Sequence, residues 1–204
     1  MIQAALFDYG GVLSEGGGAG SVKHMVANAL GIADDEVRDF GDVFGLLMTG
    51  HITSEVFLQE VHALHPQAPR PTLEGLLAEA TIFAASRPVY ELAARLRAAG
   101  IKTGILSNMF AFSAEAIRER ELFKDFDPVL LSYETHLMKP DPAFYTLAAQ
   151  RLGVPSQNIV FIDDRQEMTA AAERLGMQTV WAQHAQQIVD DTTRLIQEQN
   201  GIRL

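Results

Sequence analysis

The sequence predicts an α/β fold in which a doubly wound parallel sheet is interrupted, after its first strand, by an all-helical insert. From residue 86 onward, short apolar runs alternate with segments of helical spacing. Such alternation implies βαβ crossovers and a parallel sheet covered on both faces. Between about residues 20 and 85, apolar residues recur at three- and four-residue spacing, and no strand pattern is convincing.

The elements follow from these patterns in chain order. The first strand is expected at residues 2–7, an apolar run followed by glycines typical of a turn and a hinge. Helices are then expected at residues 21–31, 34–50, 53–65, 71–81, 88–100, 112–123, 141–153, 167–177 and 184–199. The remaining strands are expected at residues 101–107, 127–132, 158–164 and 178–182. We therefore predict an α/β core at residues 1–15 and 86–204, with a helical insert at 16–85.

Composition narrows the possible functions. The chain has 204 residues, with 16 basic and 26 acidic side chains and a formal charge of −10. This charge repels polyphosphate backbones, so nucleic acid is not expected as a partner. The absence of cysteine excludes disulfides and thiolate chemistry. The opening MIQAALFDYGG lacks the basic segment of a signal peptide, and no apolar run has the length of a membrane span, so we expect a cytoplasmic protein away from membranes. Its oligomeric state is not readable from the sequence.

Polar residues lie where the predicted strands end. In an open parallel sheet, ligands bind outside the carboxyl ends of the strands, where the connections change direction. The residues expected there are Asp8, Ser107, Asn108, Lys139, Asp163 and Asp164. The winding implies the strand order 3-2-1-4-5, which brings these side chains into one crevice.

These residues suit phosphoryl transfer through a covalent aspartyl phosphate, with Asp8 as the nucleophile. A carboxylate can approach a phosphate dianion only when a cation neutralises their repulsion, and Mg²⁺ accepts oxygen ligands for this role. We expect Asp8, Asp164 and the backbone carbonyl of Gly10 to bind Mg²⁺. Asp163 is a further candidate metal ligand.

Two other residues have the chemistry to bind the phosphate. A lysine and a small hydroxyl can hold phosphate oxygens, and we assign these catalytic and substrate-binding roles to Lys139 and Ser107. Asn108 lies next to Ser107 and is expected to bind substrate as well.

Four motifs resemble those of the haloacid dehalogenase (HAD) superfamily. They are FDYGGVL at 7–13, ILSN at 105–108, MKPDPAFY at 138–145 and VFIDD at 160–164, and the helical stretch near 20–85 is similar to the cap of the C1-capped branch. This resemblance covers nearly the whole chain and implies a Rossmann-like core with a cap. It also implies a magnesium-dependent phosphatase-type hydrolase whose cap selects a small phosphorylated metabolite, such as a sugar phosphate or a nucleotide.

Two positions depart from the family pattern. The usual phosphatase motif has a second Asp two residues after the nucleophile, which acts as general acid and base, but here that position is Gly10. Members resembling the soluble epoxide hydrolase N-terminal domain and the sugar-phosphate phosphatases, with an FDxGxV motif, share this gap. Four residues after Asp164, where an acid or Asn commonly helps to organise the site, the chain has Met168. Two interpretations stay open: the metal site has fewer supporting groups than is usual in the family, or Asp163 takes up part of that task.

Two alternatives stay open. A 2-haloacid dehalogenase uses the same Asp without metal, but it resembles D-x-Y-G-T, with Tyr two residues after Asp, whereas here Tyr9 follows Asp8 directly. A non-catalytic member that binds a phosphorylated ligand or a partner protein is the second alternative. Phosphate ester hydrolysis that requires Mg²⁺, halide release in EDTA, or neither activity would distinguish the three.

Overall fold

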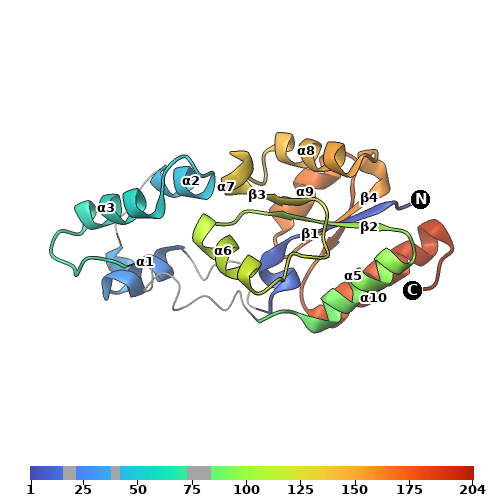
Figure 1. The fold of residues 1–204 in the computed structure, drawn as a ribbon, viewed down its shortest axis with the longest axis horizontal. Helices are drawn as coiled ribbons and strands as arrows, with labels where there is room; N and C mark the ends of the chain where they lie inside the picture. Colours follow the sequence, from blue (N-terminus) through green and yellow to red (C-terminus); the bar gives the residue numbers. More distant parts are fainter. Residues whose placement is uncertain (16–21, 38–41, 73–83) are drawn as a thin grey trace.

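The computed structural model describes residues 1–15, 22–37, 42–72 and 84–204 (Figure 1). Its sheet has five parallel strands in the order β3-β2-β1-β4-β5, which confirms the predicted fold class and strand order. The strands are β1 (Ala4–Phe7), β2 (Lys102–Ser107), β3 (Val129–Leu131), β4 (Ile159–Asp163) and β5 (Gln178–Trp181).

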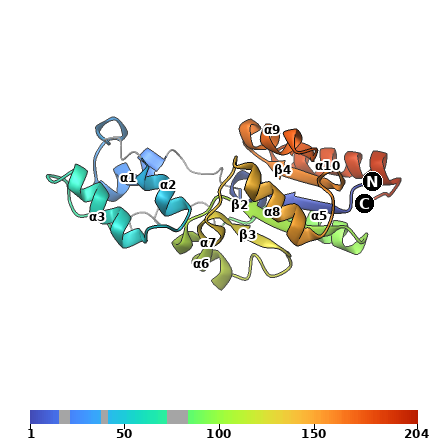
Figure 2. The same ribbon diagram turned by 90° about the horizontal axis from the view of Figure 1, so that it is seen from above.

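Helices cover both faces of this sheet, as Figures 1 and 2 show. They are α5 (Arg87–Ala98), α6 (Ala111–Glu119), α7 (Ser132–Thr135), α8 (Pro142–Leu152), α9 (Gln166–Arg174) and α10 (Ala185–Asn200), with the 3-10 turn η4 (Ser156–Asn158) before β4. Successive side chains of a strand point to opposite faces. In β1, Ala5 and Phe7 pack in the cluster formed with α5, α6 and α10, whereas Ala4 and Leu6 pack in the cluster formed with α8 and α9. Because both clusters are apolar, β1 is hydrophobic throughout and buried at the centre of the sheet.

Some local predictions needed correction. The turn expected after β1 is present as η1 (Tyr9–Leu13), in which Gly10 and Gly11 have non-helical dihedral angles, whereas the glycines at 16–18 that were expected to form a hinge lie outside the described residues. Helix α6 ends at Glu119, earlier than expected, and Glu121 has a positive φ of 58°. The short helix α7, which directly follows β3, was not predicted.

The helical segment lies to one side of the sheet (Figures 1 and 2). It contains α1 (Val22–Leu30), the 3-10 turn η2 (Asp34–Glu36), α2 (Val43–Met48) and α3 (Ser54–Leu64). Two short elements replace the long helix expected at 34–50, and residues 38–41 lie outside the described part. Most of the helix expected at 71–81 also falls outside it, because residues 73–83 are not described. The apolar cluster of this segment includes Phe110 and Phe112, which lie next to and within α6.

The chain leaves and re-enters the α/β part at neighbouring points. Ser14 and Ala85 form an antiparallel bridge, Glu15 N donates to Ala84 O at 2.7 Å, and Ser86 N donates to Leu13 O at 2.8 Å. The domain boundaries at 15/16 and 85/86 stay a prediction, but these bonds place the two crossing segments side by side.

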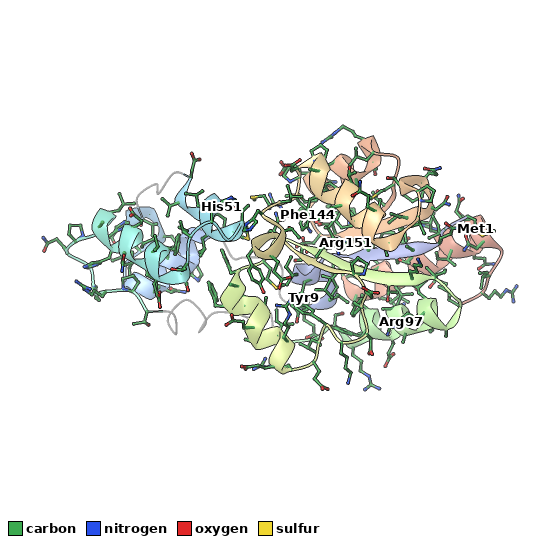
Figure 3. All side chains as sticks on the ribbon, turned by 45° about the horizontal axis from the view of Figure 1, so that its top comes forward. Met1, Tyr9, His51, Arg97, Phe144 and Arg151 are labelled. Carbon is green, nitrogen blue, oxygen red and sulfur yellow. The ribbon has the colours of Figure 1, made fainter. Side chains whose placement is uncertain are left out.

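A second contact joins α2 to α7. Ser132 Oγ donates to Met48 O at 2.6 Å, and His136 Nδ1 lies 2.8 Å from Thr49 O. His51, at the junction in Figure 3, packs against His136 with ring centroids 4.9 Å apart and ring planes tilted by 53°. The helical segment is therefore held against the carboxyl end of β3 as well as by the two crossing segments. None of the described helices combines the length and the apolar character needed to cross a membrane.

Candidate functional site

Asp8 lies at the carboxyl end of β1, in the middle of the sheet. Its backbone N–H donates to Ile162 O at 2.9 Å, which extends the pairing with β4 by one residue. Its side chain is buried, and Oδ1 accepts a hydrogen bond from Tyr9 N at 2.7 Å. Backbone contacts on both sides of the residue thus fix the direction of the carboxylate.

The turn after Asp8 requires glycine at its third position, Gly11. Gly11 has a φ of +69°, a conformation that L side chains rarely adopt. A Cβ atom at Gly11 would lie 2.4 Å from Asp164 Oδ2. The turn therefore brings the backbone after Asp8 directly against the Asp164 side chain, and any larger residue would displace this acid.

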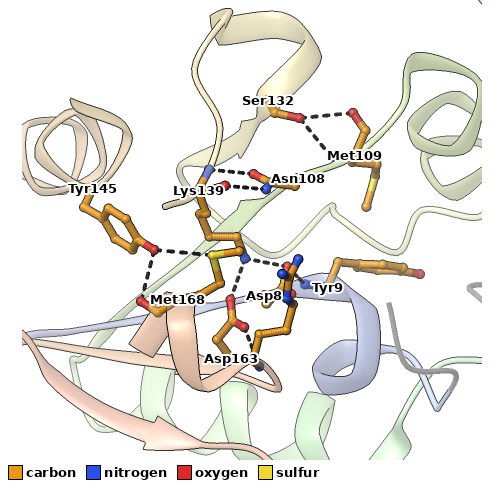
Figure 4. Close-up of polar contacts among 10 residues, drawn as sticks. Asp8, Tyr9, Asn108, Met109, Ser132, Lys139, Tyr145, Asp163 and Met168 are labelled. Carbon is orange, nitrogen blue, oxygen red and sulfur yellow. Dashed lines mark hydrogen bonds and ion pairs between the residues drawn. The ribbon is translucent and has the colours of Figure 1, made fainter. Parts of the chain in front are cut away.

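Lys139 is the buried cation of the site. Its Nζ atom lies 3.0 Å from Asp8 Oδ1 and 2.6 Å from Asp163 Oδ2 (Figure 4). The side-chain amide of Asn108 binds the backbone of Lys139 in both directions. Asn108 Nδ2 donates to Lys139 O at 2.8 Å, and Lys139 N donates to Asn108 Oδ1 at 2.7 Å. In the structure the Asn108 amide thus positions Lys139, and its contact with substrate stays a prediction.

The segment after Lys139 has the expected helix start. Asp141 caps α8 by accepting a hydrogen bond from Ala143 N at 2.9 Å, and Pro142 occupies the first turn. Ser107 is the last residue of β2 and is buried. Because Phe7 pairs with Ile105, Ser107 extends past β1 to the same edge of the sheet as Asp8.

Burial and charge together set the protonation of these groups. Burial raises the pKa of Asp163 to about 6, although Lys139 acts in the opposite direction, and Asp8 adds to the increase. Burial alone would disfavour the lysine ammonium, but Asp8 and Asp163 outweigh it and raise the pKa of Lys139 above its usual value. Lys139 is therefore a fixed positive charge at neutral pH.

Three carboxylates gather beside this lysine. Asp8, Asp163 and Asp164 each offer one oxygen, and these three atoms lie within 4.8 Å of one another. The two oxygens of Asp163 already accept hydrogen bonds, one from Lys139 Nζ and the other from Arg165 N at 2.8 Å. Of the predicted ligands, Asp8 and Asp164 are thus better placed to hold a cation than Asp163.

Met168, one of the two departures from the motif pattern, and Tyr9, which follows Asp8, are both buried core residues. Met168 is buried in the core against α8, and its carbonyl accepts a hydrogen bond from Tyr145 OH at 3.0 Å. Its side chain packs in that core, while Asp163 forms the ion pair with Lys139. Tyr9 is also a core residue, with its ring edge-on to Phe123 at 5.4 Å.

Two contacts at the site could not be predicted from the sequence. The first is the pair of hydrogen bonds between the Asn108 amide and the Lys139 backbone. The second is a hydrogen bond of 3.0 Å from Trp181 Nε1 to Asp164 O. Asn108 was predicted to bind substrate, and no polar partner was predicted for Trp181. Their partners are distant in sequence, so spacing alone could not reveal these bonds.

Comparison with known proteins identifies the family. Residues 2–176 match the family model of haloacid dehalogenase-like hydrolases. Acyl-CoA dehydrogenase family member 10 of Mus musculus is 26% identical over 205 residues, which cover 95% of this chain and 19% of that protein. The (S)-2-haloacid dehalogenase of Pseudomonas fluorescens is 34% identical over 88 residues, which cover 43% of this chain and 39% of that protein. The chain thus spans about a fifth and about two fifths of these relatives' lengths.

Solved structures have the same fold. A HAD-like family hydrolase from Porphyromonas gingivalis superposes with a TM-score of 0.79 and 24% identity, covering 98% of this chain and 100% of that chain. A HAD family enzyme from Bacteroides thetaiotaomicron, in complex with magnesium and inorganic phosphate, has a TM-score of 0.68 and 19% identity over 88% of this chain and 93% of that chain. At these identities the structures show the fold alone. Since the family model matches most of the chain, the protein belongs to the haloacid dehalogenase-like hydrolases.

Proposed function

We propose that this hydrolase cleaves a small phosphomonoester with the help of Mg²⁺, through an aspartyl phosphate on Asp8. The observation that carries the proposal is the arrangement of Asp8, Asp163 and Asp164 around one point beside the buried Lys139. The Mg²⁺ and phosphate bound to the structural relative from Bacteroides thetaiotaomicron support it.

The residues present fit Mg²⁺. Hard divalent cations prefer oxygen ligands, and the three acids of the site supply only oxygen. When ionised, the three carboxylates carry three negative charges against the single positive charge of Lys139, so the site has a net charge that a divalent cation balances. Asp8, Asp164 and the Gly10 carbonyl would hold the ion. Bound there, it would neutralise the repulsion between the phosphate and the carboxylates.

Asp8, Lys139 and Ser107 have different roles in the proposed reaction. An Asp8 carboxylate oxygen attacks phosphorus, the bond from phosphorus to the ester oxygen breaks, and the leaving alcohol takes its proton from water. Water next attacks the acyl phosphate, which releases inorganic phosphate and restores the Asp8 carboxylate. Lys139 offers its fixed charge to the phosphate oxygens, and Ser107 offers a hydroxyl from the end of β2.

Removal of Asp164 tests the metal assignment. Asp164→Ala should weaken Mg²⁺ binding by about 10-fold or more, because the site loses one of its carboxylate ligands. The activity measured against Mg²⁺ concentration should shift to higher concentration by the same factor. Asp190→Ala is a control of equal charge change, since Asp190 is on the exposed side of α10, where it binds Gln186. An Mg²⁺ requirement equal to that of the wild type would refute the role of Asp164.

An acid placed at position 10 tests the effect of the missing general acid. Gly10 has φ −67° and ψ 128°, a conformation open to any L residue, so an Asp is not strained there. The wild type should hydrolyse p-nitrophenyl phosphate much better than alkyl phosphates, because a nitrophenolate leaves without protonation. Gly10→Asp should raise turnover mainly on alkyl phosphates, by part of the roughly 10²–10⁴-fold that acid–base catalysis contributes.

The control for this variant is Gly10→Asn, which has nearly the same size but cannot transfer the proton. Melting temperatures measured beside the kinetics check that both variants fold. If Gly10→Asp folds and the ratio of alkyl to nitrophenyl turnover does not exceed that of Gly10→Asn, the proton comes from elsewhere. Halide release from 2-haloacids in EDTA, without phosphate ester hydrolysis, would instead establish the dehalogenase reaction.

A further inference from the structure

We propose that Trp181 is a positioning residue for the metal site, which it supports through the backbone of Asp164. This inference rests on the proposed function, because it assumes that Asp164 is a ligand of Mg²⁺. The indole Nε1–H donates to Asp164 O at 3.0 Å.

The position of Trp181 explains why its side chain reaches this carbonyl. Trp181 is the last residue of the edge strand β5 and pairs with Asp163, the last residue of β4. The ladder ends one step later, where Ala182 N donates to Asp163 O at 2.9 Å. Asp164 follows Asp163, after the backbone pairing between β4 and β5 has ended. The indole N–H of Trp181 therefore provides a hydrogen bond from β5 to the Asp164 carbonyl, which no backbone N–H of β5 reaches in the ladder. Asp164 is thereby held from the β5 side by Trp181, while Gly11 lies against its side chain.

The exposure of the indole argues against a packing role. Trp181 is 42% exposed and lines a groove between β5 and α10. A tryptophan whose main function is core packing is much more buried on average. Its backbone carbonyl accepts a hydrogen bond from Gln187 Nε2 at 3.2 Å, which ties the end of β5 to α10. The backbone of Trp181 is thus bound to α10, and its indole N–H is directed at the Asp164 carbonyl.

The substitution Trp181→Phe isolates this hydrogen bond, because Phe keeps an aromatic ring and removes the donor. Mg²⁺ binding measured by isothermal titration calorimetry, without substrate, should weaken by about 2- to 10-fold, the range expected for one net hydrogen bond. Thr179→Val is the matched control. Thr179 is on the same strand and donates to Glu173 Oε1 at 2.5 Å, away from Asp164, so its loss should leave Mg²⁺ affinity unchanged.

Fluorescence gives a second readout, because Trp181 is the single tryptophan of the chain. In the wild type, Mg²⁺ should change the emission spectrum with the midpoint found by calorimetry. In Asp164→Ala, this change should move to higher Mg²⁺ concentration. An emission spectrum that stays constant through the calorimetric transition would contradict the coupling.

The outcomes separate this inference from the proposed function. If the wild type binds no Mg²⁺, the metal assignment fails and the inference fails with it. If Asp164→Ala weakens Mg²⁺ binding while Trp181→Phe binds as tightly as Thr179→Val, the metal site stands and only the role of Trp181 is overturned. If Trp181→Phe and Thr179→Val weaken Mg²⁺ binding equally, the effect comes from destabilisation of β5 as a whole. That result also overturns the positioning role of Trp181.

Discussion

Asp8→Asn is expected to lower phosphate ester hydrolysis by about 10³-fold or more, since an amide cannot form the acyl phosphate. The fold should persist, because the Asn side-chain oxygen can still accept the hydrogen bond from Tyr9 N, and Lys139 keeps its ion pair with Asp163. Steady-state kinetics on p-nitrophenyl phosphate measure the loss. Trapping of labelled phosphate on the wild-type protein, and its absence from the variant, would locate the covalent intermediate.

The control for this variant is Asp125→Asn, which removes the same charge from an exposed carboxylate near Arg97. Its activity should equal that of the wild type. Residual activity of Asp8→Asn above about a tenth of the wild type, in protein shown to be folded, would remove Asp8 from the role of nucleophile.

Lys139→Met is expected to reduce both activity and stability. Asp8 and Asp163 are buried beside Lys139, and removal of the shared cation leaves these carboxylates without compensation. Breaking a buried ion pair in this way costs about 3–5 kcal/mol of unfolding free energy. For a chain of this length, the melting temperature should fall by roughly 6–20 °C. Hydrolysis should be lost as well, because the phosphate loses its fixed positive partner.

A double variant separates the two effects of Lys139. Lys139→Met combined with Asp163→Asn removes one of the two uncompensated charges and leaves that of Asp8, so part of the stability should return while activity stays absent. Lys102→Met is a control on the neighbouring strand, since Lys102 donates to Leu152 O at 2.6 Å and contacts no carboxylate of the site. If the double variant regained activity together with stability, Lys139 would act on the protein and not on the substrate.

Much of the α/β part was predictable because its signals are local. Continuous apolar runs such as 159–162 predict a strand buried on both faces, and the alternation with helices requires parallel crossovers. The winding then placed the first strand at the centre, which the order β3-β2-β1-β4-β5 confirms. Short elements were less predictable. Helix α7 has only four residues, too few for an apolar period to show.

The fold class, the strand order and the gathering of four site residues at one edge of the sheet could be derived from the amino-acid sequence; these residues are Asp8, Lys139, Asp163 and Asp164. These features follow from periodicity and winding, which act along the chain. The contacts that hold each of these groups became visible in the three-dimensional structure. Asn108 forms hydrogen bonds with Lys139, 31 positions away, and Trp181 donates a hydrogen bond to Asp164, 17 positions away. Such hydrogen bonds depend on how close the strand ends lie in space. The sequence around an Asn or a Trp is the same whether its side chain binds the backbone or a substrate.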